Sequence, residues 1–322
     1  MALRSAFTEL LGIEVPILQA AIWPATSPQL VAAVGEAGAI GSVGAVFAGA
    51  DALLAQIERV RELSDRPFVV NHVVPNLDED AFAATLEARP EAISFALGEP
   101  GELVARAHEA GIKVIHQIHT LGQALTAGEL GIDVFIAQGS EAGGQGMTEG
   151  VSTMALVPQV VDAVAPVPVL AAGGVADGRG LAAALALGAA GANVGTRFLA
   201  SAEAGAPESW KERIVAARSE DCVRFEAWGA IMPARGYDVV PRVIRTDFVA
   251  EWHGRLGNAA AQAEELRRRI MGSVGAGRPD ELTPFTGQTA GLIAEVLPAG
   301  EIVRRMAAEA CDALRGAAAG CA

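Results

Sequence analysis

Residues 134–147, VFIAQGSEAGGQGM, contain the groups in this sequence that are best suited to chemistry. The stretch begins as a short apolar run, becomes polar at Gln138, and then carries Glu141 together with Gly143, Gly144 and Gly146. An apolar run of this kind indicates a buried strand, and clustered glycines let the backbone approach another group closely. We therefore expect a phosphate-bearing cofactor to lie against this loop.

Side-chain amides recur on three of the apolar runs. Asn71 lies in the run 68–74, Gln117 in the run 113–119, and Gln138 ends the run 134–138. An amide offers both donors and acceptors, so the three together would suit a planar heterocycle such as a flavin ring. A phosphosugar site would instead be expected to carry Lys and paired carboxylates. For Asn71, an equally good interpretation is a polar residue satisfied inside the fold.

Two later runs end in glycine. The run 167–172 precedes Gly173 and Gly174, and the run 192–198 contains Gly195 followed by Thr196. If these runs are strands seven and eight of a barrel, their loops are where such barrels frequently bind phosphate. Glycine exposes backbone N–H groups, Thr196 adds a hydroxyl, and the helix after the seventh run would direct its positive end there. The alternative is that these glycines serve only turns and packing.

Few acid or base candidates are present. Glu141 could be a general acid or base, or it could anchor its loop, and we favour the anchor. His119 shares a face with Gln117, and His119 and His72 are the remaining candidates for a base, whereas His108 and His253 are expected at the surface. The sequence contains no HExxH, GxSxG or Walker motif, and its three cysteines form no CxxC pair, so we expect no metal site.

The elements that would position these residues alternate regularly. Eight apolar runs are each followed by a helical stretch within about 200 residues, which predicts an α/β protein with a (β/α)8 TIM barrel. The first turn, residues 20–24, has no glycine, so the dinucleotide fingerprint of an open doubly wound sheet is absent. The runs are 17–21, 39–43, 68–74, 92–97, 113–119, 134–138, 167–172 and 192–198.

The chain divides into three predicted parts. We expect residues 1–217 to form a cofactor-binding barrel and residues 218–290 to form a mainly helical insert near its mouth, with 251–271 as one long helix. We expect residues 291–322 to form a C-terminal helix that packs back on the barrel.

Composition narrows the possible partners. Of the 322 residues, 51% are hydrophobic and 19% are charged, which predicts a large buried core. The net charge of −14 argues against a nucleic-acid partner, which would demand clustered Lys and Arg. The first residues lack a signal-peptide apolar region, and no uncharged apolar run reaches the roughly 20 residues of a membrane span. We expect a cytoplasmic protein that acts on a small molecule, with a homodimer as one oligomeric state to test.

Three blocks resemble a known family: QGSEAGG at 138–144, AAGGVADGRGL at 171–181 and GANVGTRF at 191–198. In this order they resemble the nitronate monooxygenase family, FMN-dependent barrels related to flavin-dependent enoyl-ACP reductases and NADH:quinone reductases. The resemblance runs over residues 16–198 and 287–315. It implies an FMN cofactor contacted by Ala20, Ala21, Ile22, Asn71, Gln117, Gln138, Gly143, Gly144, Gly173, Gly174, Asn193, Val194, Gly195 and Thr196. The turn at 20–22 differs at two of three positions from the Ala-Pro-Met turn of the family.

One departure bears on the reaction. The family motif reads EAGGH, with the histidine as the presumed base, whereas this chain reads EAGGQ with Gln145 at that position. A glutamine amide cannot act as a general base, although it can donate a hydrogen bond to a substrate oxygen. Nitronates are already deprotonated and need no base. We therefore expect oxidation of a nitronate or similar electron-rich substrate with O2, and poor activity on neutral nitroalkanes.

Other functions stay open at this point. Within the flavoenzymes, the alternative is an NAD(P)H-dependent reductase that acts on a quinone or an enoyl thioester. From another class, a flavin-free barrel lyase or isomerase with a phosphorylated substrate would also explain the glycine pairs. A binding protein without turnover is the third possibility.

Overall fold

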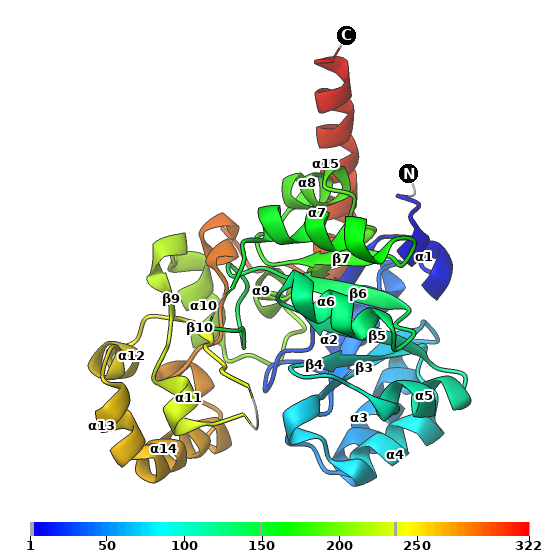
Figure 1. Cartoon of the computed structure of the whole chain (residues 1–322). Helices are drawn as coiled ribbons and strands as arrows, with labels where there is room; N and C mark the ends of the chain where they lie inside the picture. The colour runs from blue at the N-terminus through cyan, green and yellow to red at the C-terminus, as the bar shows by residue number, and fades with distance from the viewer. Residues whose placement is uncertain (1–2, 149, 235–236, 322) are drawn as a thin grey trace.

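The computed structural model describes residues 3–148, 150–234 and 237–321. Eight parallel strands pair in the order β1-β8-β7-β6-β5-β4-β3-β2, and a bridge between Leu18 and Ile40 joins β1 to β2, so the barrel closes. The predicted (β/α)8 barrel is therefore confirmed (Figure 1). The strands are β1 (Ile17–Gln19), β2 (Gly41–Gly44), β3 (Phe68–Val73), β4 (Ala92–Ala96), β5 (Lys113–Ile118), β6 (Val134–Gln138), β7 (Val169–Ala172) and β8 (Gly191–Val194).

Helices follow the strands and surround them. Their starts are set locally by polar caps: the side chains of Ser27, Asp78 and Thr120 each accept a hydrogen bond from the backbone N–H three residues later. These helices are α2 (Pro28–Glu36), α3 (Ala50–Leu63), α4 (Glu79–Ala88), α5 (Glu102–Glu109), α6 (Leu121–Gly128), α7 (Thr153–Val164), α8 (Gly178–Ala186), and, after β8, α9 (Thr196–Leu199) and α10 (Glu208–Ala216).

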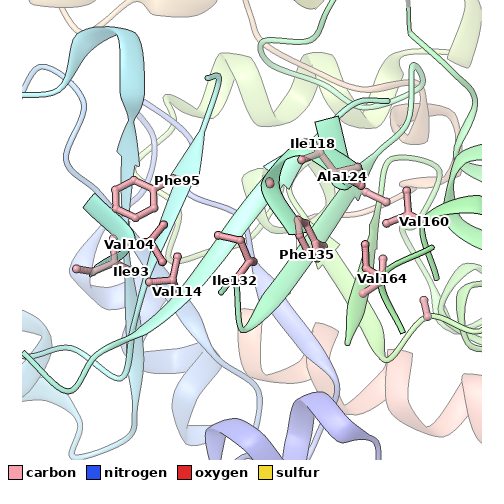
Figure 2. Packing of buried hydrophobic residues seen from close by; sticks show 14 of the residues in the cluster. Ile93, Phe95, Val104, Val114, Ile118, Ala124, Ile132, Phe135, Val160 and Val164 are labelled. Carbon is pink, nitrogen blue, oxygen red and sulfur yellow. The ribbon is translucent and has the colours of Figure 1, made fainter. Parts of the chain in front are cut away.

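Strand alternation divides the core into two layers. One layer lies between strands and helices, where Phe95 and Phe135 from β4 and β6 pack with Val104 and Val160 from α5 and α7 (Figure 2). The other layer fills the barrel interior with Val69, Ile115, Val134 and Leu170 from β3, β5, β6 and β7, and the unpredicted helix α1 (Ala6–Leu11) adds Phe7 and Leu11 to it. Apolar side chains therefore fill the amino-terminal end of the barrel, and a binding site is expected at the carboxyl ends of the strands.

The segment after α10 differs from its prediction. Two short strands, β9 (Cys222–Arg224) and β10 (Arg242–Ile244), pair antiparallel. The predicted long helix is wrong: the chain instead forms α12 (Asp247–Trp252), α13 (Leu256–Ala261) and α14 (Ala263–Gly275), after the short α11 (Trp228–Ile231). α12 ends at Trp252, and the next two residues break the helix: His253 has an extended backbone, and Gly254 has a left-handed φ of +71°. In Figure 1 this yellow-to-orange segment lies beside the barrel.

The last helix, α15 (Ala299–Ala319), packs its amino-terminal half on α8 and α2 of the barrel through Ile302, Val303 and Met306. Its last turns extend away from the rest of the chain (Figure 1). Within the described residues, no helix combines the length and apolarity required to cross a membrane.

Candidate active site

A cavity of ≈ 190 Å³ opens at the carboxyl ends of the barrel strands. All eight strands, or the loops directly after them, contribute to its wall, as expected for the functional face of such a barrel. The structure brings together here most of the residues predicted from sequence: Ala20, Ala21, Ile22, Asn71, Gln117, Gln138, Gly143, Gly144, Gln145, Gly173, Asn193, Gly195 and Thr196.

Three predicted residues lie off this wall. Strand alternation turns Asn193 into the cavity and Val194 outward, where Val194 is buried in the core between β8 and the helices. Gly174 lies just beyond the wall, in a left-handed backbone with φ +76°. His119 follows β5 but lines a separate small cavity behind the loop of residues 139–147.

The cavity also contains residues that the sequence interpretation missed. Ser42 and Ser94 come from the inward faces of β2 and β4, and strict two-residue alternation along those strands could have identified them. Trp23 and Phe47 come from the loops after β1 and β2. Phe285 and Thr289 come from a segment far along the chain, and no local pattern indicates that they reach the barrel.

The polar groups of the cavity fit a flavin. Ser42 Oγ and Asn193 Oδ1 are buried and have no hydrogen-bond partner within the described chain, although buried polar atoms are normally paired. The Asn71 amide is held by its nitrogen, which donates to Ser94 Oγ at 2.7 Å, so its oxygen is available as an acceptor. A heterocycle with both donors and acceptors at its edge would satisfy these groups.

Gly195 supports the same fit. Its φ of −105° is one that any residue adopts, and a Cβ added there would come no nearer than 3.7 Å to another side chain. Neither backbone strain nor packing therefore explains a glycine at this position. The missing side chain instead leaves room in the cavity, next to Ala20 and Ile22, for a bound group to approach the backbone.

The part of the cavity wall predicted to bind phosphate differs from the sequence prediction at one helix, α8. The N-terminus of α8 does not point free N–H groups at the cavity, because Asp177 accepts from Arg179 N (2.9 Å) and Gly180 N (3.2 Å), and Glu309 Oε2 accepts from Gly178 N (2.9 Å). Two carboxylates at this helix end would repel a phosphate, so that part of the prediction is wrong. The remaining phosphate donors at the wall are the backbone of Gly173 and Gly195 and the hydroxyl of Thr196, whose oxygen accepts from Gly287 N at 2.9 Å and keeps its proton for donation.

The loop after β6 is held from two directions. Gln138 Nε2 donates to the backbone oxygen of Gln145 at 2.9 Å, which folds the loop back over the strand end. On its other edge the loop pairs with the start of β10 and the residues before it: Arg242 N donates to Gly144 O (3.0 Å), and Val240 N donates to Gly146 O (2.8 Å). The position of Gln145 in the cavity therefore depends on residues of the insert as well as on the barrel.

Glu141 serves as an anchor. Its two carboxylate oxygens accept from Thr153 N at 3.1 and 3.0 Å, and one of them also accepts from Thr153 Oγ1 at 3.1 Å. This ties the loop to the first residue of α7, and Glu141 does not line the cavity. The structure thus supports the anchor over a role as general acid or base.

The glycines of the loop have separate physical reasons. A Cβ at Gly143 would lie 2.7 Å from the carbonyl carbon of Thr286, so the close approach predicted for this glycine is to another backbone segment. Gly144 has open space around it but a φ of +70°, which a side chain would strain.

The electrostatics of the cavity are unusual for an enzyme. Within the described parts of the chain, no Asp, Glu, His, Lys, Arg, Cys or Tyr side chain lines it. His119 is 3% exposed. Burial first, and then the neighbouring His116, lower the pKa of its imidazole to about 4, while a hydrogen bond to the Gln145 backbone acts against the shift. His72 faces away from the barrel interior. On the outer side of the strand its Nε2 forms a 2.9 Å hydrogen bond with Thr85 of α4. Neither histidine is placed to act as a base on a bound substrate.

Comparison with known proteins agrees with this site. The sequence profile of the nitronate monooxygenase family matches residues 4–85 and 78–309. A probable nitronate monooxygenase of Staphylococcus saprophyticus is 35% identical over 284 residues, covering 74% of this chain and 79% of that protein. A (3aS,4S,5R,7aS)-5-hydroxy-7a-methyl-1-oxo-octahydro-1H-indene-4-carboxyl-CoA dehydrogenase of Mycobacterium tuberculosis is 38% identical over 252 residues, covering 77% of this chain and 68% of that protein.

Solved structures extend the likeness over nearly the whole chain. FabK from Thermotoga maritima superposes with a TM-score of 0.89 at 34% identity, covering 98% of this chain and 99% of that one. Nitroalkane oxidase from Streptomyces ansochromogenes gives a TM-score of 0.84 at 30% identity, covering 97% and 99%. The molecule is accordingly an oxidoreductase that uses a flavin cofactor. The fold, the cavity and these matches lead to one conclusion, which is that the chain belongs to the nitronate monooxygenase family.

Proposed function

We propose that the flavin is FMN and that the enzyme oxidises alkyl nitronates with O2. The observation that carries this proposal is the cavity wall, which holds amides and hydroxyls but no ionisable side chain among the described residues. Proton abstraction from a neutral carbon acid requires a base in hydrogen-bond reach. A nitronate arrives without that proton, so a wall of neutral groups is sufficient for it.

The chain's own residues would divide the binding of FMN between them. Asn71, Gln117 and Asn193 would contact the polar edge of the ring, while Gly173, Gly195 and Thr196 would hold the phosphate. The chemistry that the flavin supplies when bound is removal of two electrons from the substrate and their return to O2. The protein contributes orientation and a water-poor, uncharged environment around the reacting atoms.

Gln145 would take a binding role in place of a catalytic base. Its backbone is fixed by Gln138, so its side-chain amide is presented to the cavity from a held position. An amide N–H can donate to an oxygen of the nitronate group, where the negative charge is concentrated. That interaction binds and orients the substrate without moving a proton.

The test compares protonation states of one substrate. Purified protein would first be shown to contain FMN by its visible absorbance and by mass spectrometry of the released cofactor. O2 consumption would then be followed with ethyl nitronate and with freshly neutralised nitroethane at equal concentration. We expect turnover with the nitronate and a kcat/KM for nitroethane that is lower by at least about 10²-fold, the size of effect that a missing base produces. Equal activity on both forms would contradict the proposal.

A second candidate is an NAD(P)H-dependent reductase of an enoyl thioester or a quinone. The observation in its favour is the similarity to the indene-4-carboxyl-CoA dehydrogenase of Mycobacterium tuberculosis at 38% identity and to FabK at a TM-score of 0.89. Family membership, in contrast, favours both flavin options over a flavin-free lyase or isomerase. Anaerobic flavin reduction separates the two remaining candidates, because rapid bleaching by NADH or NADPH would favour the reductase and rapid bleaching by a nitronate would favour the oxidase.

A further inference from the structure

Two aromatic side chains lie where the cavity opens to solvent. Trp23, from the loop after β1, and Phe47, from the loop after β2, both line the cavity, and their ring centroids are 5.0 Å apart at an interplanar angle of 62°. Phe47 is 56% exposed, one of the few large apolar side chains in the described chain with so much of its surface in water. The pair therefore presents apolar surface at the entrance of the site.

Phe47 also has an unfavourable backbone. Its φ of +56° is left-handed, a region that a bulky residue without local polar contacts occupies only at an energetic cost. Burial does not compensate for this cost, since more than half of the ring surface stays exposed. Strained residues of this kind concentrate at functional sites, where a ligand benefits from the side chain's position.

A second strained apolar residue faces the same cavity. Leu97, directly after β4, has a φ of +53° and lines the cavity. Among the described non-glycine residues with positive φ, the only other one is Arg89, which ends α4. Helix termination explains Arg89. For Phe47 and Leu97, the shared feature is their place in the cavity wall.

We propose that Trp23, Phe47 and Leu97 form a subsite for an uncharged hydrocarbon chain of the substrate. The proposal rests on the proposed function and extends it by naming the part of the substrate outside the reacting group. Val46 and Phe285 add further apolar surface to the wall of the same cavity. A carboxylate on the chain would lose water here without finding a cation, because the described wall contains none. The enzyme therefore selects chains that end in a methyl group over chains that end in a carboxylate.

Turnover tests the subsite through chain length. For primary alkyl nitronates from ethyl to hexyl, we expect kcat/KM of the wild type to rise by up to about fourfold per added CH2, the factor that corresponds to its transfer from water. Phe47→Asn removes the ring but keeps a residue that tolerates a left-handed backbone, and Phe47→Gly removes the backbone strain as well. Both variants should reduce the rise per CH2. The matched control is Leu125→Asn, at an equally exposed position (56%) on α6, which should leave it unchanged.

Binding without turnover separates this proposal from the proposed function. Calorimetric titration of the purified holoenzyme would compare butanamide, hexanamide and adipamic acid, which carries a carboxylate at its far end. We expect hexanamide to bind at least about tenfold more tightly than the other two, at up to fourfold per CH2, and to lose that advantage in Phe47→Asn. Phe47-dependent hexanamide binding without any nitronate turnover would retain the subsite and refute the proposed reaction. The subsite would be overturned if the affinity for the amides did not depend on chain length. It would also be overturned if Phe47→Asn and wild type bound hexanamide with the same affinity.

The same series distinguishes the two sources of such a chain. Matched 2-enoyl thioesters with NADPH can replace the alkyl nitronates in the turnover assay. A chain-length dependence that appears only with the thioesters would assign the subsite to an acyl group, and one that appears only with the nitronates would assign it to an alkyl group.

Discussion

The substitution Gln145→His tests directly whether the cavity lacks a base. Gln145 lines the cavity, and its backbone oxygen is held by Gln138 Nε2 at 2.9 Å, so the replaced side chain starts from a defined position. No described residue at the wall offers a competing base. An imidazole introduced there, with an ordinary pKa of about 6.5, would be the first group able to accept a proton from a bound carbon acid.

The expected size of the effect follows from general-base catalysis. A positioned base contributes about 10²–10⁴ in rate, or about 2.7–5.4 kcal/mol at about 1.36 kcal/mol per tenfold. We therefore expect Gln145→His to raise kcat/KM for neutral nitroethane by at least about 10²-fold. Its kcat/KM for ethyl nitronate, which needs no base, should stay within a few-fold of the wild type. The rate with nitroethane should rise as pH increases through about 6.5, because only the neutral imidazole accepts a proton.

The assay is initial O2 consumption with nitroethane that has been freshly neutralised, so that spontaneous ionisation during the measurement is small. Gln145→Asn is the control, since it alters the same side chain without adding a base. The reasoning would be refuted if wild type and Gln145→His oxidised nitroethane at the same rate. It would also be refuted if Gln145→Asn gained activity equal to that of the histidine variant.

Three further outcomes are expected. Gly195→Ala should leave the thermal unfolding of the apoprotein unchanged but weaken flavin binding by about tenfold or more. Gly143→Ala should instead destabilise the apoprotein by about 2 kcal/mol or more, because its Cβ would collide with backbone atoms. Calorimetry and flavin titration measure the two effects, and a stable Gly143→Ala variant with normal flavin content would contradict the packing argument. Glu141→Gln should reduce the free energy of unfolding by about 1–3 kcal/mol, because its hydrogen bonds to Thr153 are weakened. The pH dependence of kcat should stay unchanged. Loss of one limb of the pH profile would instead indicate that Glu141 acts as an acid or base. The pKa of His119 is lowered to about 4 in the folded chain, which therefore binds fewer protons there than the unfolded chain, so stability is lost as pH falls from about 6.5 to about 4. Urea unfolding at about pH 7 and about pH 4.5 should show a smaller loss of unfolding free energy in His119→Gln than in wild type. Identical losses in the two proteins would contradict a buried, neutral histidine.

Local patterns carried much of the prediction. The barrel followed from the alternation of apolar runs with capped helices, since both signals are written within a few neighbouring residues. Asn71, Gln117 and Gln138 were identified for the same reason, because the end of a strand and its inward face are local properties. The error at residues 251–271 was also local: Gly254 in a helical pattern is compatible with either a weak helix position or a left-handed break, and only the folded chain decides between them.

The sequence by itself determined the fold, the family and the presence of the neutral Gln145 in the glycine-rich loop, because each is a matter of residue identity and spacing. The tertiary structure decided what the neighbouring groups do. His119 lies behind the loop, Glu141 binds Thr153 twelve residues later, and Glu309 caps the N-terminus of α8 from 131 residues away. None of these contacts lies within a single strand or helix. The same long-range contacts bring Trp23, Phe47 and Leu97 to one cavity wall. No local pattern encodes that meeting, because each of the three follows a different strand and only closure of the barrel brings the strand ends together.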